Sequence, residues 1–216
     1  MTKIKLSDGT EMQIYIARGA SAKKLPGIIL IQEAFGVNTH IRSVADRIAL
    51  EGYVVYAPEI YHHSAGDNFT CAYTEFQTKA MPHYEAVTRE TLDVDLKGTH
   101  EALCADPAVD ASKIGCIGFC LGGRVTFYAN SILPLQCAVS FYGGGIDPEM
   151  LDCADKQSGP IFLAWGGKDK HIPVSSRKKI SGALSRAKKP FIEIAFADAD
   201  HGFFCEERAS YHADSA

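Results

Sequence analysis

The chain has 216 residues, 46% of them hydrophobic, which is enough to bury a sizeable core in one domain, residues 1–216. Its formal net charge is -4, from 22 Lys and Arg against 26 Asp and Glu, so no electrostatic footprint for nucleic acid is present. The longest apolar run, residues 27–31, is too short to span a bilayer, and the N-terminus lacks the apolar segment of a signal peptide.

The seven cysteines are an odd number and are scattered along the chain, which does not resemble a disulfide framework. This usage predicts a reduced, cytoplasmic protein with buried thiols. No Cys and His residues have the paired spacing of a zinc site. His62 and His63 are adjacent and are expected to point in divergent directions. We therefore predict no metal site and no cofactor.

Alternating polar and apolar residues predict an N-terminal antiparallel hairpin over residues 3–6 and 11–17. Buried strands and amphipathic helices alternate after it. The expected strands cover residues 27–32, 53–57, 113–118, 136–142, 160–165 and 191–196, and the expected helices cover 38–51, 82–105, 121–131 and 173–187. This order predicts an α/β fold with a mostly parallel central sheet, helices on both faces and the hairpin at one edge.

Two segments fit this pattern less well. Residues 59–81 are irregular and are expected to form a long loop or lid. The stretch that follows His201 is too short to form a full closing helix over the last strand. We expect this closing helix to be incomplete, as in a shortened chain.

The strongest chemical signal is the segment Gly118-Phe119-Cys120-Leu121-Gly122, between an expected strand and an expected helix. A nucleophile on such a sharp turn needs glycine two residues before and two residues after it, because side chains there would collide. The helix N-terminus also favours a thiolate. By itself, this segment fits a buried structural cysteine beside a tight turn equally well.

Two further residues favour catalysis. Asp169 follows the strand 160–165, and His201 follows the strand 191–196. The chain order Cys, Asp, His is that of the α/β-hydrolases, and sites on open α/β sheets lie at the carboxyl ends of strands. We expect His201 to act as general base and acid, and Asp169 to orient it. Asp198 and Asp200 are rival acids, but they are very close to His201 in sequence.

The oxyanion of an acyl-transfer reaction needs two backbone donors. The amide of Leu121 is one candidate. The second should come from the loop after the first central strand, which makes the amide of Ala34 the other candidate. The preceding residue, Glu33, is either an exposed loop carboxylate or a carboxylate inside the pocket near Cys120.

Several segments together resemble the dienelactone hydrolase family, the carboxymethylenebutenolidases, over about residues 27–211. They are Gln-Glu-Ala-Phe-Gly-Val-Asn, Gly-Tyr-Val-Val-Tyr-Ala-Pro, Gly-Phe-Cys-Leu-Gly-Gly, Phe-Tyr-Gly, Gly-Gly-Lys-Asp and His-Gly-Phe. The resemblance implies an α/β-hydrolase fold, hydrolysis of an enol-lactone, and a triad of Cys120, His201 and Asp169.

The same resemblance implies a role for residues around the nucleophile. Glu33 would lie in the pocket, interact with the resting thiol and help to form the thiolate when substrate arrives. Phe35 and Tyr142 would line the pocket.

The sequence departs from the family at the two arginines that bind the substrate carboxylate in its best-known members. Residues 70–85 contain no arginine, and Lys79 is their only Lys or Arg. After His201, Arg208 is a displaced substitute. Arginine and lysine are not equivalent at a bidentate carboxylate site. Dienelactone is therefore a doubtful substrate, and a related lactone or ester fits as well.

We predict a hydrolase, a monomer or homodimer, that cleaves a small-molecule lactone or activated ester through an acyl-enzyme on Cys120. Three alternatives stay open: a broad carboxylesterase or thioesterase, a hydrolase-fold binding protein without catalysis, and a thiol redox sensor. The last is disfavoured because Cys116, the nearest cysteine, is expected to face the core.

Overall fold

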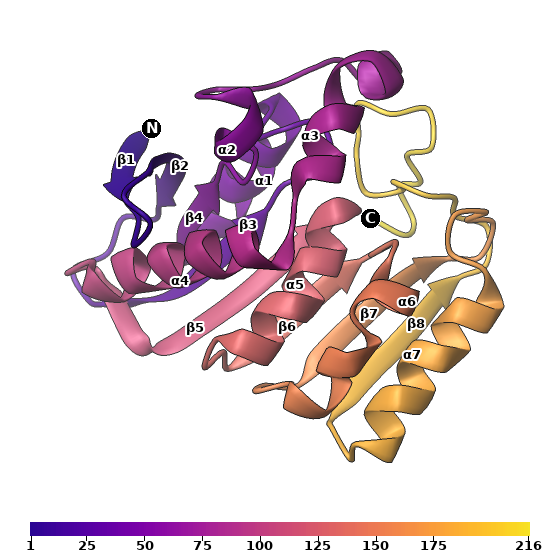
Figure 1. Cartoon of the computed structure of the whole chain (residues 1–216). Helices are drawn as coiled ribbons and strands as arrows, with labels where there is room; N and C mark the ends of the chain where they lie inside the picture. Colours follow the sequence, from indigo (N-terminus) through magenta and orange to yellow (C-terminus); the bar gives the residue numbers. More distant parts are fainter. The chain divides into compact units, whose positions relative to one another are not determined.

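The computed structural model describes all 216 residues, and the chain forms two compact units, Met1–Gly115 and Cys116–Ala216. In the first unit four strands lie in the order β1-β2-β4-β3 (Figure 1). β1 (Thr2–Lys5) pairs antiparallel with β2 (Glu11–Arg18), and β2 pairs antiparallel with β4 (Val54–Pro58). β4 pairs parallel with β3 (Leu25–Ile31). The predicted antiparallel hairpin at one edge is confirmed.

Two helices pack on these four strands. α1 (Thr39–Leu50) lies behind them in Figure 1, and α4 (Arg89–Ala105) lies in front. α1 begins as expected, because the Asn38 side chain accepts a hydrogen bond from the amide of Ile41, at 3.1 Å. Its buried stripe includes Ile41, Val44 and Ala45. The helices thus cover the sheet with apolar faces.

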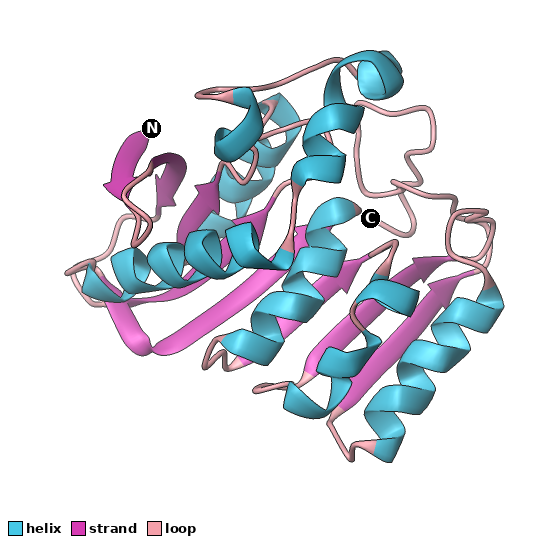
Figure 2. Cartoon of the chain, in the orientation of Figure 1, coloured by secondary structure: helices cyan, strands magenta, loops and turns pink.

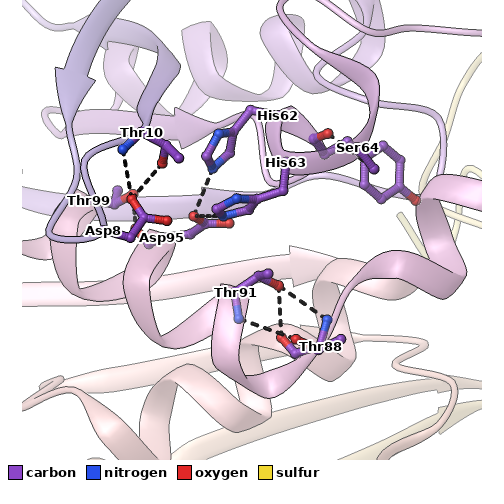
Figure 3. A network of polar contacts seen from close by, with 10 residues as sticks. Asp8, Thr10, His62, His63, Ser64, Thr88, Thr91, Asp95 and Thr99 are labelled. Carbon is purple, nitrogen blue, oxygen red and sulfur yellow. Dashed lines mark hydrogen bonds and ion pairs between the residues drawn. The ribbon is translucent and has the colours of Figure 1, made fainter.

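One prediction about this unit is wrong: residues 82–105 form two helices. α3 (Met81–Ala86) ends before Val87, which is extended. Thr88 then caps α4, because its hydroxyl accepts from the amide of Thr91 at 3.3 Å and the Thr91 hydroxyl accepts from the Thr88 amide at 3.2 Å (Figure 3). This reciprocal cap starts a new helix where apolar periodicity alone predicts a continuous one.

Residues 59–81, expected to be an irregular loop, contain three short helices. They are α2 (His62–Ala65), the 3₁₀ turn η1 (Tyr73–Glu75) and the π-helical turn η2 (Phe76–Ala80). Each is too short to show a hydrophobic period, which explains why the sequence did not indicate them.

β5 (Val109–Phe119) runs from the first unit into the second and is longer than predicted. In the second unit β6 (Cys137–Phe141), β7 (Ile161–Gly166) and β8 (Phe191–Phe196) are parallel, in that order. α5 (Leu121–Ile132) and α7 (Val174–Arg186) lie on one side of these three strands (Figure 2). The short α6 (Ile146–Glu149) and η3 (Leu151–Lys156) connect β6 to β7.

After β8 the chain forms turns and no helix up to residue 216 (Figure 2). No helix of the protein has both the length and the apolar character needed to cross a membrane. The mostly parallel arrangement of the central strands agrees with the predicted fold class.

Candidate active site

Cys120 stands at the junction of β5 and α5, in a backbone conformation that residues with a side chain rarely adopt. Its φ is 55° and its ψ is -114°. The turn is possible because Gly118 has no side chain: a Cβ atom there would lie 2.1 Å from the carbonyl oxygen of Gly122. The predicted need for glycine before the nucleophile is thus a direct steric requirement. Such strain is typical of a functional position.

His201 joins Cys120 to Asp169. Its Nε2 lies 3.1 Å from the Cys120 Sγ, and its Nδ1 lies 2.8 Å from the Asp169 Oδ2. All three residues belong to the second unit, at the carboxyl ends of β5, β7 and β8. We call them the Cys-His-Asp cluster. The structure brings together the three residues that the sequence predicted as a catalytic group.

Asp169 is itself held in place. Its side chain is 1% exposed, and its Oδ1 accepts hydrogen bonds from the amides of His171, at 2.8 Å, and Ile172, at 3.3 Å. The rival acids are engaged elsewhere. Asp198 pairs with Lys168 at 3.1 Å, and the Asp200 carboxylate accepts from the backbone amide of His201 at 2.7 Å. Asp169 is therefore the carboxylate that reaches the imidazole.

Electrostatics in the Cys-His-Asp cluster favour a charged imidazole. Burial alone would lower the pKa of His201, but Cys120 and Asp169 outweigh it and raise this pKa to about 10. Burial likewise acts to raise the pKa of Asp169, yet the hydrogen bond and charge of His201 hold it below its ordinary value. These directions fit an imidazolium that is stabilised by the Asp169 carboxylate.

One aromatic ring of the β6 end contacts the imidazole, and further aromatic rings pack nearby. The Tyr142 ring is fully buried and meets the His201 ring edge to face, with centroids 5.2 Å apart. Phe203 packs against Tyr142 at 5.1 Å, and Phe204 against Phe119 at 4.8 Å. Sequence reasoning placed Tyr142 at the pocket wall but missed the phenylalanines. Their signal was the apolar pair directly after His201-Gly202.

The first helical residue of α5 is Leu121, which is buried. The first amides of a helix have no partner within the helix. The Leu121 amide, next to the Cys120 side chain, is therefore in a suitable place to donate to an oxyanion formed on the nucleophile's substrate.

The loop after β3, which belongs to the first unit, carries the other predicted pocket residues. Glu33, Ala34 and Phe35 are all buried, with Glu33 at 0% exposed. The interpretation of Glu33 as an exposed loop carboxylate is therefore wrong, because the loop folds inward. The Ala34 carbonyl accepts a hydrogen bond from Tyr61 at 3.3 Å, and the Phe35 ring packs on Tyr73 at 4.7 Å.

The two candidate cations have different surroundings. Lys79, on η2, forms an ion pair with Glu75 at 2.8 Å, and its side chain is 57% exposed. Arg208 packs against the backbone directly after the imidazole: a Cβ atom on Gly202 would lie 2.2 Å from its Nη1. Of the two, Arg208 is the one placed within the second unit beside His201.

The expected divergence of His62 and His63 is wrong. Their rings lie with centroids 3.8 Å apart, and both Nε2 atoms reach the Asp95 Oδ1, at 2.9 and 3.0 Å (Figure 3). Adjacent residues leave a helix about 100° apart. The two imidazoles are nevertheless long enough to converge on one acceptor that lies between them.

The family model for the dienelactone hydrolase family matches residues 12–216. The chain belongs to the dienelactone hydrolase family. A Synechocystis sp. protein, provisionally named as a carboxymethylenebutenolidase, is 35% identical over 211 residues, which are 94% of this chain and 85% of that protein. The family and this relative support a hydrolase that acts on lactone or ester bonds.

Solved structures of this family have the same fold. A provisionally named dienelactone hydrolase from Klebsiella pneumoniae is 30% identical, with a TM-score of 0.84, covering 100% of this chain and 92% of that one. A dienelactone hydrolase-like promiscuous phosphotriesterase from metagenomic libraries is 25% identical, with a TM-score of 0.82, covering 97% of this chain and 86% of that one. These likenesses confirm the predicted α/β-hydrolase fold.

Proposed function

We propose that the protein is a cysteine-dependent hydrolase that cleaves a lactone or an activated ester through an acyl-enzyme on Cys120. The observation that carries the proposal is the position of His201 Nε2, 3.1 Å from the Cys120 Sγ. At this separation the imidazole can hold the proton of the thiol and leave a thiolate, which is the reactive nucleophile.

In the first half of the reaction, the Cys120 thiolate attacks the carbonyl carbon and the amide of Leu121 donates to the oxyanion. The bond between the carbonyl carbon and the ester oxygen then breaks, and His201 gives its proton to the leaving oxygen. In the second half, His201 takes a proton from water while the hydroxide attacks the thioester. The bond to sulfur breaks, which restores the thiolate beside the imidazolium. Asp169 stabilises that cation throughout.

Thiolates are good leaving groups and moderate bases, so a cysteine suits esters whose own leaving group is stable. An enol ester or an aryl ester meets this condition. The ion pair of Lys79 with Glu75 weakens its candidacy as a carboxylate-binding residue. We propose that Arg208 binds the substrate carboxylate if the substrate has one, with the buried Tyr142 lining the pocket beside His201.

The test is the steady-state rate on three activated substrates with wild type and Cys120→Ala. The substrates are an enol-lactone with a free carboxylate, its methyl ester and a neutral aryl ester. We expect Cys120→Ala to lose turnover of all three, and unchanged turnover would refute the proposal. Arg208→Gln should raise KM for the carboxylate-bearing lactone alone. Equal wild-type rates on all three would favour a broad carboxylesterase.

A further inference from the structure

A second group of chemically capable side chains lies in the first unit, apart in sequence from the Cys-His-Asp cluster. His62 and His63 of α2 and Asp95 of α4 place one ligand atom each within 4.8 Å of one another (Figure 3). Both Nε2 atoms point to the same carboxylate oxygen, at 2.9 and 3.0 Å. We call these residues the His-His-Asp cluster. The hydrolase mechanism uses none of them.

The Asp95 carboxylate is the unusual member. The residue is 0% exposed, and its Oδ1 receives both imidazoles, whereas its Oδ2 is buried without a hydrogen-bond partner. A buried carboxylate oxygen is normally hydrogen bonded, because removing it from water without compensation is costly. A cation beside the carboxylate would supply the missing interaction. This orphan oxygen points to a ligand independently of the two histidines.

The donor set selects the kind of cation. Two imidazole nitrogens and one carboxylate oxygen are typical ligands of Zn²⁺ and related first-row metals, whereas Mg²⁺ and Ca²⁺ favour all-oxygen sites. Bonds of about 2.0–2.2 Å in a tetrahedral site put ligand atoms roughly 3.3–3.6 Å apart. The separations of 2.9 and 3.0 Å in the His-His-Asp cluster therefore need to grow by only a few tenths of an ångström.

Access and protonation also permit binding. The His62 side chain is 4% exposed, but that of His63 is 21% exposed, so solvent reaches the His-His-Asp cluster from the His63 side. Both rings now direct Nε2 at an acceptor. To bind a metal, each Nε2 must carry no proton, so the proton of the neutral ring has to lie on Nδ1.

We propose that His62, His63 and Asp95 form a zinc-type metal site with its fourth position open to water. The metal would join α2 to α4. Because Ser64 of α2 also contacts His83 of α3, at 3.0 Å, the site would fix the start of the segment that carries α3. The alternative is a metal-free network in which two imidazoles only satisfy a buried carboxylate.

The experiment uses the full chain, stripped of metal with a chelator and kept reduced. Zn²⁺ affinity is measured by competition with a chromophoric chelator, and Co²⁺ binding is followed by absorption. The variants are His63→Gln and Asp95→Asn, and His83→Gln is the control on a neighbouring histidine. His63 is at the surface, so its variant should fold even if Asp95→Asn does not.

We expect one equivalent of Zn²⁺ to bind wild type and His83→Gln alike. It should bind His63→Gln at least ~100-fold more weakly, because loss of a direct ligand costs no less than loss of a residue that supports a ligand. Bound Zn²⁺ should also raise the melting temperature of wild type more than that of His63→Gln. Bound Co²⁺ should show tetrahedral d–d bands without a thiolate charge-transfer band. Equal affinity for wild type and His63→Gln, or a thiolate band, would overturn the proposal. Hydrolase activity is not a readout, so this result is independent of the proposed function.

Discussion

Replacing Asp169 with Asn tests whether the carboxylate orients and charges the imidazole of the Cys-His-Asp cluster. Asparagine is nearly the same size and keeps an oxygen for the amides of His171 and Ile172. Its NH₂ group would then face the His201 Nδ1, now 2.8 Å from Oδ2. That nitrogen would have to accept a hydrogen bond, which moves the ring proton to Nε2. The imidazole could then no longer take the proton of the Cys120 thiol.

The size of the effect follows from the pKa of His201. A rise from 6.5 to about 10 favours the imidazolium by roughly 5 kcal/mol, supplied by Cys120 and Asp169 together against the cost of burial. Loss of the Asp169 charge and hydrogen bond therefore lowers the share of the imidazolium. The wrong tautomer adds to this loss, and in serine hydrolases the same replacement costs about 10⁴-fold. We expect kcat/KM to fall by about 10²–10⁴-fold.

The assay is kcat/KM on an activated aryl ester, together with the rate of Cys120 alkylation by iodoacetamide at pH 7. Asp198→Asn is the matched control, because Asp198 is 75% exposed, pairs with Lys168 and carries the same charge. It should leave both rates within about twofold, as expected for an exposed ion pair. A folded Asp169→Asn variant that retains more than a tenth of the wild-type kcat/KM would refute the reasoning.

Three further predictions concern pH and packing. Because the folded pKa of His201 is raised, its imidazolium stabilises the protein fully below about pH 6.5 and loses this effect as pH rises through about 10. In urea unfolding, the free energy of unfolding of wild type should therefore exceed that of His201→Gln by less and less as pH rises from 7 to 10. A difference that stays constant over this range would contradict the prediction. Gly118→Ala should destabilise the folded protein by about 1–3 kcal/mol and reduce kcat, because its Cβ would meet the Gly122 backbone. Gly182→Ala in α7 is the control, and it should not lower the melting temperature, because its Cβ would meet only the end of the Arg186 side chain. Asn130→Ala removes buried hydrogen bonds to Gly159, so it should lower the free energy of unfolding by about 1–3 kcal/mol for each group left unpaired, as measured by urea unfolding. A loss below about 0.5 kcal/mol, roughly the scatter of surface substitutions, would show that the unpaired groups find other partners.

The sequence was sufficient to predict the Cys-His-Asp cluster because each member follows its own strand. Cys120, Asp169 and His201 lie within a few residues of the ends of β5, β7 and β8, and the carboxyl ends of parallel strands meet at one edge of a sheet. Strand positions can be read from apolar runs, so the meeting of the three side chains needed no knowledge of tertiary packing.

The first unit was harder to predict because its features depend on contacts rather than on periodicity. The break before α4 comes from two threonine hydroxyls, which apolar patterns do not register. The convergence of His62 and His63 depends on Asp95, which lies about thirty residues further along the chain. Side-chain directions on a short helix follow from what packs against it, and a sequence pattern does not carry that information.

This difference explains why the structure supports a proposed reaction more directly than a proposed substrate. The proposed reacting groups lie on turns fixed by backbone constraints, such as the steric need for Gly118. Glu33 and Lys79, which the sequence predicted as pocket residues, lie on the loop after β3 and on η2. There an inward fold or an ion pair changes what a side chain can bind. Arg208 illustrates the point: it is displaced in sequence from the family's second arginine, yet it packs beside His201-Gly202. If Arg208→Gln raises KM only for the carboxylate-bearing lactone, the position of Arg208 beside Gly202 gives it a carboxylate-binding role despite its displacement in sequence.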